Sequence, residues 1–225
     1  MIEEILPAGA VAVDTREDLL DSELFPEERA ALGDAVEKRR REFISARACA
    51  HRALAQLGLP RLGIATGDRG EPLWPEGVVG SITHCDGYRA CAVARALQIA
   101  TLGIDAEPNE PLPAGVLDEI ALAEERDALG DLVRAEPAVR WDRFLFSAKE
   151  AVYKAWFPLA RRWLGFEDVA LSVDLEERSF GVRLLVSDPP PAARRLQLLA
   201  GRWLVRDGLL LTAVALPAGE SPGPG

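Results

Sequence analysis

Helical and strand-like segments lie in separate blocks on either side of a proline-rich stretch at 108–115. Before this stretch, a helical pattern over 25–60 precedes strand-like segments at 78–107, and after it a helical pattern over 137–157 precedes further strand-like segments. A doubly wound parallel sheet would need a regular alternation of strands and helices, which this order does not provide. The sequence therefore predicts an α+β fold.

In the first half we expect a strand at 9–15 and one long helix that begins near Pro26 and is ended by Gly58 and Pro60, either continuous or broken near Gly33. Three short strand-like segments follow and predict an antiparallel meander: 78–84, 88–96 and 100–107.

In the second half we expect an amphipathic helix over 137–157, stopped by Pro158, and then several strands, with the Arg-Asp-Gly sequence at 206–208 forming a hairpin turn. We place the boundary of the two halves so that they comprise residues 1–107 and 108–225, and we expect a disordered tail over about 217–225 because it is rich in Pro, Gly and Ser.

The bulk composition excludes several classes of protein. A net charge of −10 argues against a nucleic-acid-binding protein and against a cationic membrane-surface protein. The first residues carry acids and no basic segment, so we expect no signal peptide and a cytoplasmic location. Cys49, Cys85 and Cys91 show no Cys-x-x-Cys spacing, which favours reduced thiols over a disulfide framework or a zinc site.

Lysine is rare in this chain, and two of its three lysines lie on the helix at 137–157. Of the 26 basic residues only Lys38, Lys149 and Lys154 are lysines. Helical spacing puts Glu150 and Lys154 on one stripe, which by itself could be an ordinary surface ion pair. The helix is rich in aromatic residues, however, and a mostly buried helix rarely carries Lys149, Glu150 and Lys154 without a function.

Two further carboxylates lie on the strand at 100–107. Asp105 and Glu107 are two residues apart, so their side chains face the same side of the strand and could share one cation; a solvated strand face is the alternative. Together with Glu150 they form a ligand set that suits Mg²⁺, which prefers carboxylates and substrate phosphates. The implied substrate is a phosphate ester or anhydride.

A basic cluster on the helix at 25–60 could bind such a substrate. Lys38, Arg39, Arg40 and Arg41 are consecutive, and Arg47 follows on the same helix. A solvated helix face is the simplest interpretation of the cluster alone. The implied magnesium site, together with Ser81, Thr83 and His84 at the end of a strand-like segment, favours an anion-binding site instead.

Three segments in this order resemble the Sfp-type 4'-phosphopantetheinyl transferases: WPEGVVGSITHCDGYRACAVA, GIDAEP and FSAKEAVYKAWFPL. Over roughly residues 25–215 the chain is similar to the branch with enterobactin-type and PptT-like enzymes. The resemblance implies two similar α+β halves related by a pseudo-two-fold axis, with coenzyme A bound between them. It implies Mg²⁺-dependent transfer of 4'-phosphopantetheine from coenzyme A to a serine of an apo acyl or peptidyl carrier protein, releasing 3',5'-ADP. The carriers would belong to fatty-acid, polyketide, nonribosomal-peptide or siderophore synthases, and a monomer would suffice.

The resemblance also implies roles for individual residues. The metal ligands, for Mg²⁺ or alternatively Mn²⁺, would be Asp105, Glu107 and Glu150. Glu150, or a bound water, would be the base, Lys154 would face the pyrophosphate, and Lys149 would support catalysis. The residues expected to contact coenzyme A are Arg39, Arg40, Arg47, Arg69, Gly70, Glu71, Pro72, Thr83, His84 and Lys154.

The sequence departs from the family pattern at two points. Thr66 stands where relatives often carry a basic residue, and Arg69 could supply that charge. The chain is acidic although carrier proteins are acidic too, so we expect the carrier to dock on a local patch formed by Arg161, Arg162, Trp163 and Leu164.

Two other functions would account for part of the pattern. A magnesium-dependent nucleotide phosphohydrolase would explain the carboxylates and the basic cluster, and it would release 3',5'-ADP without a carrier. A non-catalytic module that binds coenzyme A or a carrier protein would not need Asp105, Glu107, Glu150 and Lys154 to be intact.

Overall fold

The computed structural model describes residues 1–219, apart from the side chain of Leu198. The chain forms two compact units, one of residues 1–102 together with the chain from 216 onward and the other of residues 103–215. The chain passes from unit 1 into unit 2 within strand β6 (Ile99–Pro108) and returns within strand β10 (Leu209–Pro217). The boundary expected after residue 107 falls inside β6, so the motif that contains Asp105 and Glu107 belongs to unit 2.

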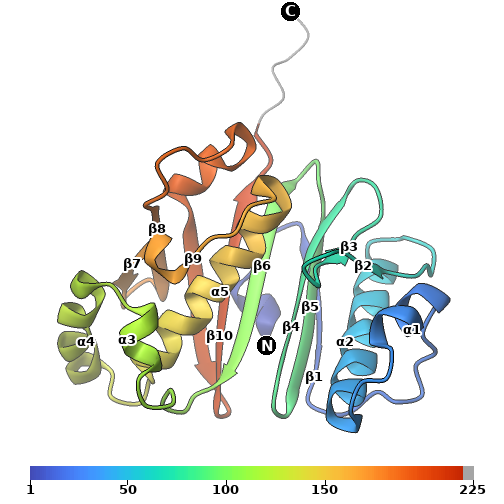
Figure 1. Ribbon diagram of the computed structural model, residues 1–225, viewed down its shortest axis with the longest axis horizontal. Helices are drawn as coiled ribbons and strands as arrows, with labels where there is room; N and C mark the ends of the chain where they lie inside the picture. Colours follow the sequence, from blue (N-terminus) through green and yellow to red (C-terminus); the bar gives the residue numbers. More distant parts are fainter. Residues whose placement is uncertain (220–225) are drawn as a thin grey trace, which may run out of the picture. The chain divides into compact units, whose positions relative to one another are not determined.

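In unit 1, helix α2 lies along an antiparallel sheet with the strand order β1-β5-β4 (Figure 1). The elements of this unit are η1 (Ile2–Ile5), β1 (Ala10–Thr15), α1 (Pro26–Leu32), α2 (Glu37–Gln56), β2 (Ala65–Thr66), β3 (Pro72–Leu73), β4 (Val78–Cys85) and β5 (Tyr88–Arg95). The central strand β5 is buried from Tyr88 to Ala94, and its small side chains let α2 pack closely through Cys49, Ala50 and Ala53.

Of the two possibilities for the first helical segment, continuous or broken near Gly33, the structure has the break. Helix α1 ends at Gly33, whose φ of 51° is accessible to glycine at little cost, and α2 begins at Glu37. The expected three-stranded meander is wrong in its last member: β4 and β5 form an antiparallel pair, but β6 is hydrogen-bonded to β10 in another sheet. Short local breaks predict that a strand exists but do not fix its partner, which depends on contacts distant in sequence.

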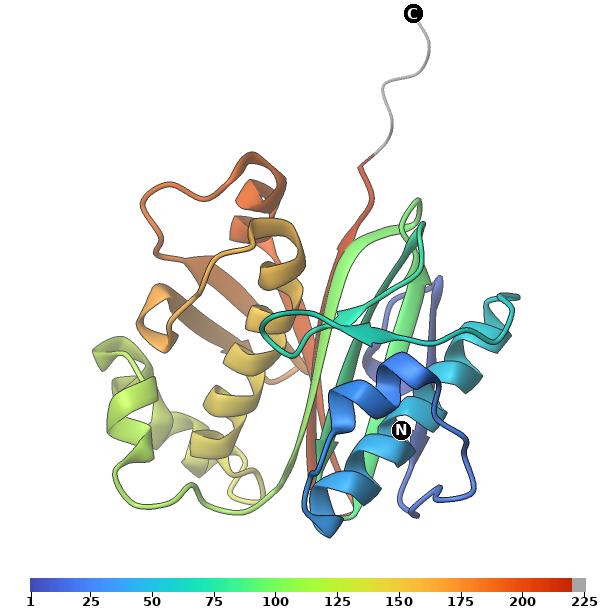
Figure 2. The ribbon, with the colours of Figure 1, turned by 45° about the vertical axis from the view of Figure 1, so that its right-hand side comes forward.

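In unit 2, helix α5 lies against a five-stranded sheet with the order β6-β10-β9-β8-β7, and α3 and α4 lie beside the helix (Figure 2). The further elements are α3 (Val116–Ile120), α4 (Ala123–Ala135), α5 (Trp141–Ala160), η2 (Phe166–Asp168), β7 (Val169–Asp174), β8 (Ser179–Leu184), η3 (Pro191–Leu198) and β9 (Ala200–Arg206). The expected hairpin turn is present between β9 and β10, where Asp207 and Gly208 both have positive φ as a tight right-twisted turn requires.

Helix α5 is fixed by aromatic packing and by a close backbone approach. Trp141, Phe144 and Trp203 are at most 1% exposed and meet edge to face, with centroids 5.2–5.9 Å apart. At Gly103 of β6, an added Cβ atom would lie 2.0 Å from the carbonyl oxygen of Ala151, so only glycine allows this spacing of helix and strand.

The expectation that Pro158 stops this helix is wrong, because α5 continues through Pro158 to Ala160 and ends where Arg161 adopts a left-handed conformation with φ 49°. The helices α3 and α4 were not expected from the sequence.

The segment expected to be a disordered tail begins in ordered structure. Pro217 still belongs to β10, and the amide of Ala218 donates to the carbonyl of Gln98. Residues 220–225 of this segment lie outside the described part of the chain.

A buried glutamate caps the first short helix of unit 1 and ties it to the rest of that unit. Glu28 is fully buried and accepts hydrogen bonds from the amide of Phe25 (2.9 Å), Nε2 of His51 (2.8 Å) and the amide of Ile64 (3.2 Å). Burial alone would raise the pKa of Glu28, but these hydrogen bonds outweigh it and hold the pKa below its ordinary value.

Unit 2 contains a glutamate in the equivalent place. Glu125 is 3% exposed and accepts hydrogen bonds from the amide of Leu122 (2.8 Å), Nζ of Lys149 (2.8 Å) and the amide of Leu171 (2.9 Å). Each glutamate therefore joins its own helix start, a nitrogen-bearing side chain on the following 20-residue helix and a backbone amide beyond that helix. This shared arrangement accords with an α+β fold of two similar halves.

Candidate active site

Strand β6 and helix α5 bring an acidic and basic group together in unit 2. Asp105 is 4% exposed, and its Oδ1 accepts a hydrogen bond from Nζ of Lys154 at 2.7 Å. The same ammonium donates to the carbonyl oxygen of Ile104 at 3.1 Å. Asp105 and Lys154, both singled out in the sequence, are therefore in contact, with Lys154 bound to the carboxylate.

The neighbouring carboxylate, Glu107, is bound to a residue that the sequence did not single out. Its Oε2 accepts a hydrogen bond from Nη1 of Arg143 at 2.8 Å, and both side chains are largely buried. Burial and the Asp105 carboxylate raise the pKa of Glu107, while Arg143 opposes them. Helical spacing could have indicated Arg143, which precedes Glu150 by two turns of α5.

Glu150 is half-buried, and within residues 1–219 no group donates a hydrogen bond to its carboxylate. Burial raises its pKa, the Lys154 ammonium opposes this, and the Asp105 carboxylate raises it further. The three carboxylates are thus electrostatically coupled, because Asp105 raises the pKa of both glutamates.

The chemistry of this group fits a hard divalent cation, which would relieve the repulsion between the carboxylates. Among the described residues, no set of three or more His, Cys, Asp or Glu is positioned to hold a metal ion as it stands. Instead, Lys154 and Arg143 are bound to two of the carboxylates, and Glu150 is the carboxylate without a donor. Oxygen ligands of the expected type are therefore present, and basic side chains hold two of the three carboxylates.

Lys149 lies apart from these carboxylates, although it precedes Glu150. It is 2% exposed, and its Nζ donates to Ile120 O (2.7 Å), Glu125 Oε2 (2.8 Å) and Phe166 O (2.9 Å). Burial lowers the pKa of Lys149, and Glu125 opposes this shift. The side chain joins α5 to the segments before and after it, which differs from the catalytic role expected from the sequence.

Unit 1 holds a small cavity of about 130 Å³ next to α2. Its lining includes five residues expected to contact coenzyme A and three that were not singled out: Arg39, Arg47, Gly70, Pro72 and His84, with Phe43, Ala46 and Ile82. Nη1 of Arg39 lies 2.7 Å from Nε2 of His84, and since arginine only donates, this histidine nitrogen is the acceptor.

Arg47 is the most constrained basic group of this cavity. It is 4% exposed, its Nη2 donates to Oγ1 of Thr66 at 3.0 Å, and its guanidinium lies 4.7 Å from the centre of the Phe43 ring. Its Nε is buried without a hydrogen-bond partner among residues 1–219, and Oε1 of Glu28 lies 3.9 Å from it. A buried guanidinium with an unused donor is suited to an anion. Thr66, which stands where relatives often carry a basic residue, thus orients Arg47.

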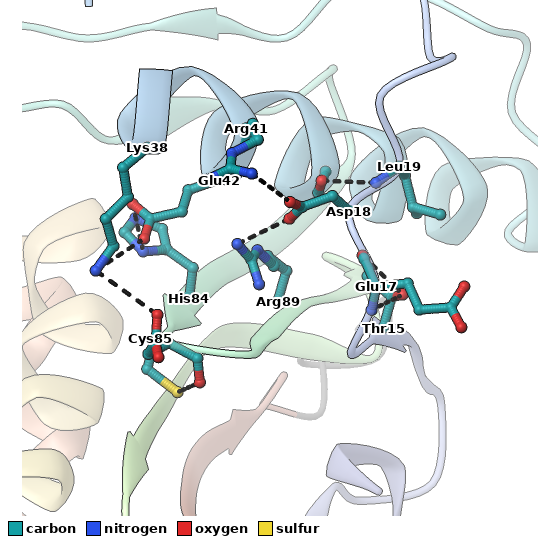
Figure 3. A network of polar contacts seen from close by, with 12 residues as sticks. Thr15, Glu17, Asp18, Leu19, Lys38, Arg41, Glu42, His84, Cys85 and Arg89 are labelled. Carbon is teal, nitrogen blue, oxygen red and sulfur yellow. Dashed lines mark hydrogen bonds and ion pairs between the residues drawn. The ribbon is translucent and has the colours of Figure 1, made fainter. Parts of the chain in front are cut away.

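Two other basic residues near the start of α2, Lys38 and Arg41, bind acids of unit 1 (Figure 3). Lys38 contacts Glu42 and Asp86, and Arg41 contacts Asp18. Glu42, which the sequence analysis did not single out, also lies 3.8 Å from Nδ1 of His84. The lining of the cavity does not include four further residues of unit 1 that were expected to contact coenzyme A: Arg40, Arg69, Glu71 and Thr83. The Glu71 carboxylate accepts from the amide of Arg69 and so stabilises its own turn.

None of the helices within residues 1–219 has an apolar stretch sufficient to span a bilayer.

Comparison with known proteins agrees with the geometry of both units. Residues 27–94 match the model of the 4'-phosphopantetheinyl transferase N-terminal domain, and residues 101–206 match that of the 4'-phosphopantetheinyl transferase superfamily. The chain is 50% identical to 4'-phosphopantetheinyl transferase Svp of Streptomyces mobaraensis, over 98% of this chain and 92% of that protein. It is 48% identical to Npt of Nocardia iowensis (96% and 99%) and 46% identical to PptT of Mycobacterium tuberculosis (96% and 98%), both also 4'-phosphopantetheinyl transferases. The expected resemblance is therefore confirmed, and the chain belongs to the 4'-phosphopantetheinyl transferase superfamily.

Proposed function

We propose that this phosphopantetheinyl transferase uses the carboxylates of unit 2 to hold Mg²⁺ and the cavity of unit 1 to bind the 3'-phosphate of coenzyme A. The reaction is transfer of 4'-phosphopantetheine from coenzyme A to a serine of a carrier protein. The observation that carries the proposal for unit 2 is the half-buried Glu150 carboxylate, which no described residue hydrogen-bonds and which is coupled to Asp105 and Lys154.

The metal ligands would be Asp105, Glu107 and Glu150. A bound Mg²⁺ would neutralise charge on the pyrophosphate oxygens of the donor. Two of the three ligands are now bound to basic side chains, Lys154 on Asp105 and Arg143 on Glu107. Lys154 would leave Asp105 for the phosphate oxygens of the donor, because an ammonium on a flexible stem can move between such partners.

Residues of the protein would accept the hydroxyl proton of the carrier serine and stabilise the leaving phosphate. The serine oxygen of the carrier forms a new bond to the β-phosphorus, and the bond from that phosphorus to the bridging oxygen breaks, so 3',5'-ADP leaves. Glu150, whose pKa is raised by burial, would accept the serine proton directly or through a water. Lys154 would stabilise the negative charge that develops on the departing phosphate.

In unit 1, Arg39, Arg47 and His84 would contact the 3'-phosphate, and Gly70 and Pro72 would line the space for the adenine. Support comes from the buried Arg47, whose Nε has no hydrogen-bond partner in the part of unit 1 that the structure describes. Arg40, Arg69, Glu71 and Thr83 lie outside the lining of the cavity, and their contact with coenzyme A stays a prediction from the sequence.

A comparison of two donors tests the 3'-phosphate contact. The Arg39→Met variant should raise KM for coenzyme A about 10–100-fold, because a charge-assisted hydrogen bond contributes about 1.5–3 kcal/mol, yet leave KM for 3'-dephospho-coenzyme A unchanged. Arg52→Met, at an exposed position on the same helix, is the control. An equal increase of KM for both donors would argue against the contact.

The carrier would dock near the end of α5, on the patch of Arg161, Arg162, Trp163 and Leu164. Trp163 is 66% exposed, whereas Leu164 is 5% exposed and supports the patch from inside. Nη1 of Arg162 donates to the carbonyl of Asp188, so a change at Arg162 would also disturb the fold. Arg161→Glu leaves this hydrogen bond of Arg162 in place and is the test: it should raise KM for the carrier and leave KM for coenzyme A unchanged, and an unaltered carrier KM would contradict the docking surface.

The partners we propose are carrier domains of fatty-acid, polyketide or nonribosomal-peptide synthases, acted on by a cytoplasmic monomer. A panel of apo carriers of these three classes would rank them, and light scattering would test the monomer.

A further inference from the structure

Arg143 of α5 is bound to three groups at the end of β6 and just beyond it. Its Nη1 donates to Oε2 of Glu107 (2.8 Å), its Nε to the carbonyl of Glu110 (3.1 Å) and its Nη2 to the carbonyl of Pro111 (2.9 Å). All three nitrogens of one planar guanidinium are therefore engaged. A planar fork with fixed donor directions holds its partners in one geometry, which the single ammonium of a lysine cannot do.

The contact fixes one oxygen of Glu107 and leaves the other available. In the described part of the chain no group donates a hydrogen bond to Oε1 of Glu107, while Oε2 is held by Arg143. Two of the three bonds of Arg143 go to main-chain carbonyls, so the arginine also restrains the backbone that follows Glu107.

We propose that Arg143 is a positioning residue, which holds Glu107 so that its free oxygen can bind the cation; this inference rests on the proposed function. Arg143 has two opposing effects on a bound cation. Its charge repels the cation, while its three hydrogen bonds align the ligand. The alignment dominates because the fork holds both the carboxylate and the backbone behind it.

Binding of Mn²⁺ alone, followed by the electron paramagnetic resonance signal of the free ion, separates these two effects. Arg143→Lys keeps the charge and loses the fork, and Arg143→Met loses both. Both variants should bind Mn²⁺ about 10–100-fold more weakly than the wild type, the usual effect of losing a residue that orients a metal ligand. If charge alone mattered, Arg143→Lys would bind like the wild type and Arg143→Met more tightly, and either result would overturn the inference. Arg183→Met, which removes an exposed ion pair with Glu124, is the matched control.

Two further measurements separate this inference from the proposed metal site. If the wild type binds no Mn²⁺, or if Asp105→Ala does not reduce the binding, the metal site is wrong and this inference is wrong with it. Binding that depends on Asp105 but is unchanged in both Arg143 variants would overturn this inference alone. In a Glu107→Gln background, Arg143→Lys should weaken Mn²⁺ binding no further; an additional loss of similar size would mean that Arg143 acts through general stability of the fold.

Discussion

Replacing Lys149 by methionine should destabilise unit 2 strongly while leaving the reacting groups in place. The Lys149 and Glu125 side chains are each 1% exposed, and the substitution would remove the three hydrogen bonds of the ammonium. Glu125 would keep two amide donors but lose its counter-charge. Removing one partner of a buried ion pair costs about 3–5 kcal/mol, because the other charge remains buried and uncompensated.

For a chain of 225 residues, this loss corresponds to a fall of about 6–20 °C in the midpoint of thermal unfolding. Urea unfolding followed by tryptophan fluorescence measures the free energy directly, since Trp141, Trp156 and Trp203 are buried in unit 2. The Lys149→Met/Glu125→Gln double variant should recover more than about 1 kcal/mol relative to Lys149→Met, because the buried charge is gone.

Activity distinguishes this structural role from the catalytic role that the sequence suggested. At temperatures where Lys149→Met is folded, its rate of phosphopantetheine transfer should stay close to that of the wild type. A variant with the wild-type unfolding midpoint and a rate reduced by about 100-fold or more would refute the reasoning, because a loss of that size is typical of an acid–base group.

Two more predictions concern packing and pH. Gly103→Ala should destabilise the protein by about 1–3 kcal/mol, because the new Cβ would clash with the carbonyl oxygen of Ala151. Gly130→Ala on α4 should instead stabilise it by about 0.5–1 kcal/mol, because the new Cβ would make only an ordinary contact with Nη1 of Arg134 at 3.6 Å. Denaturant unfolding of both variants checks this contrast, and equal effects would contradict it. Glu28→Gln should lose about 2 kcal/mol at neutral pH. Because the pKa of Glu28 is held below its ordinary 4.5, its stabilisation is complete above that pH and is lost as the pH falls through the lower folded value. The difference from the wild type should therefore shrink in acid, and a difference independent of pH would exclude the charge of Glu28 as its cause.

Local patterns predicted most of the secondary structure. The Asp-Gly pair at 207–208 specifies a tight hairpin through its positive φ angles, and Gly33 specifies the break between α1 and α2 in the same way. Pro158 misled because a proline near the end of a helix removes a hydrogen bond without ending the helix, and Arg161 ends it instead. The partner of β6 could not be predicted, since pairing with β10 joins segments about 100 residues apart in sequence.

For a similar reason, the sequence pointed to some residues of the candidate site and missed others. Asp105, Glu107, Glu150 and Lys154 could be proposed for the site because strand and helix periods place charges on one face. Lys149 has the same local pattern, but its direction is decided by Glu125, whose capping role became visible only once α4 was located. Arg143 was missed because its partners, Glu107 and the carbonyls that follow, come together only in the folded chain.

The most direct test of the central claim is the intact mass of an apo carrier protein after incubation with this enzyme, coenzyme A and Mg²⁺. We expect the mass of the carrier to increase by one phosphopantetheine group, with release of 3',5'-ADP. We expect no increase with a chelator, with Asp105→Ala or with Glu150→Gln, whereas Arg183→Met should behave as the wild type. A gain of mass that persists in Asp105→Ala, Glu150→Gln and the chelator would contradict the proposed metal site. Carrier-independent release of 3',5'-ADP, with no gain across the three classes of carrier, would contradict transfer and indicate hydrolysis.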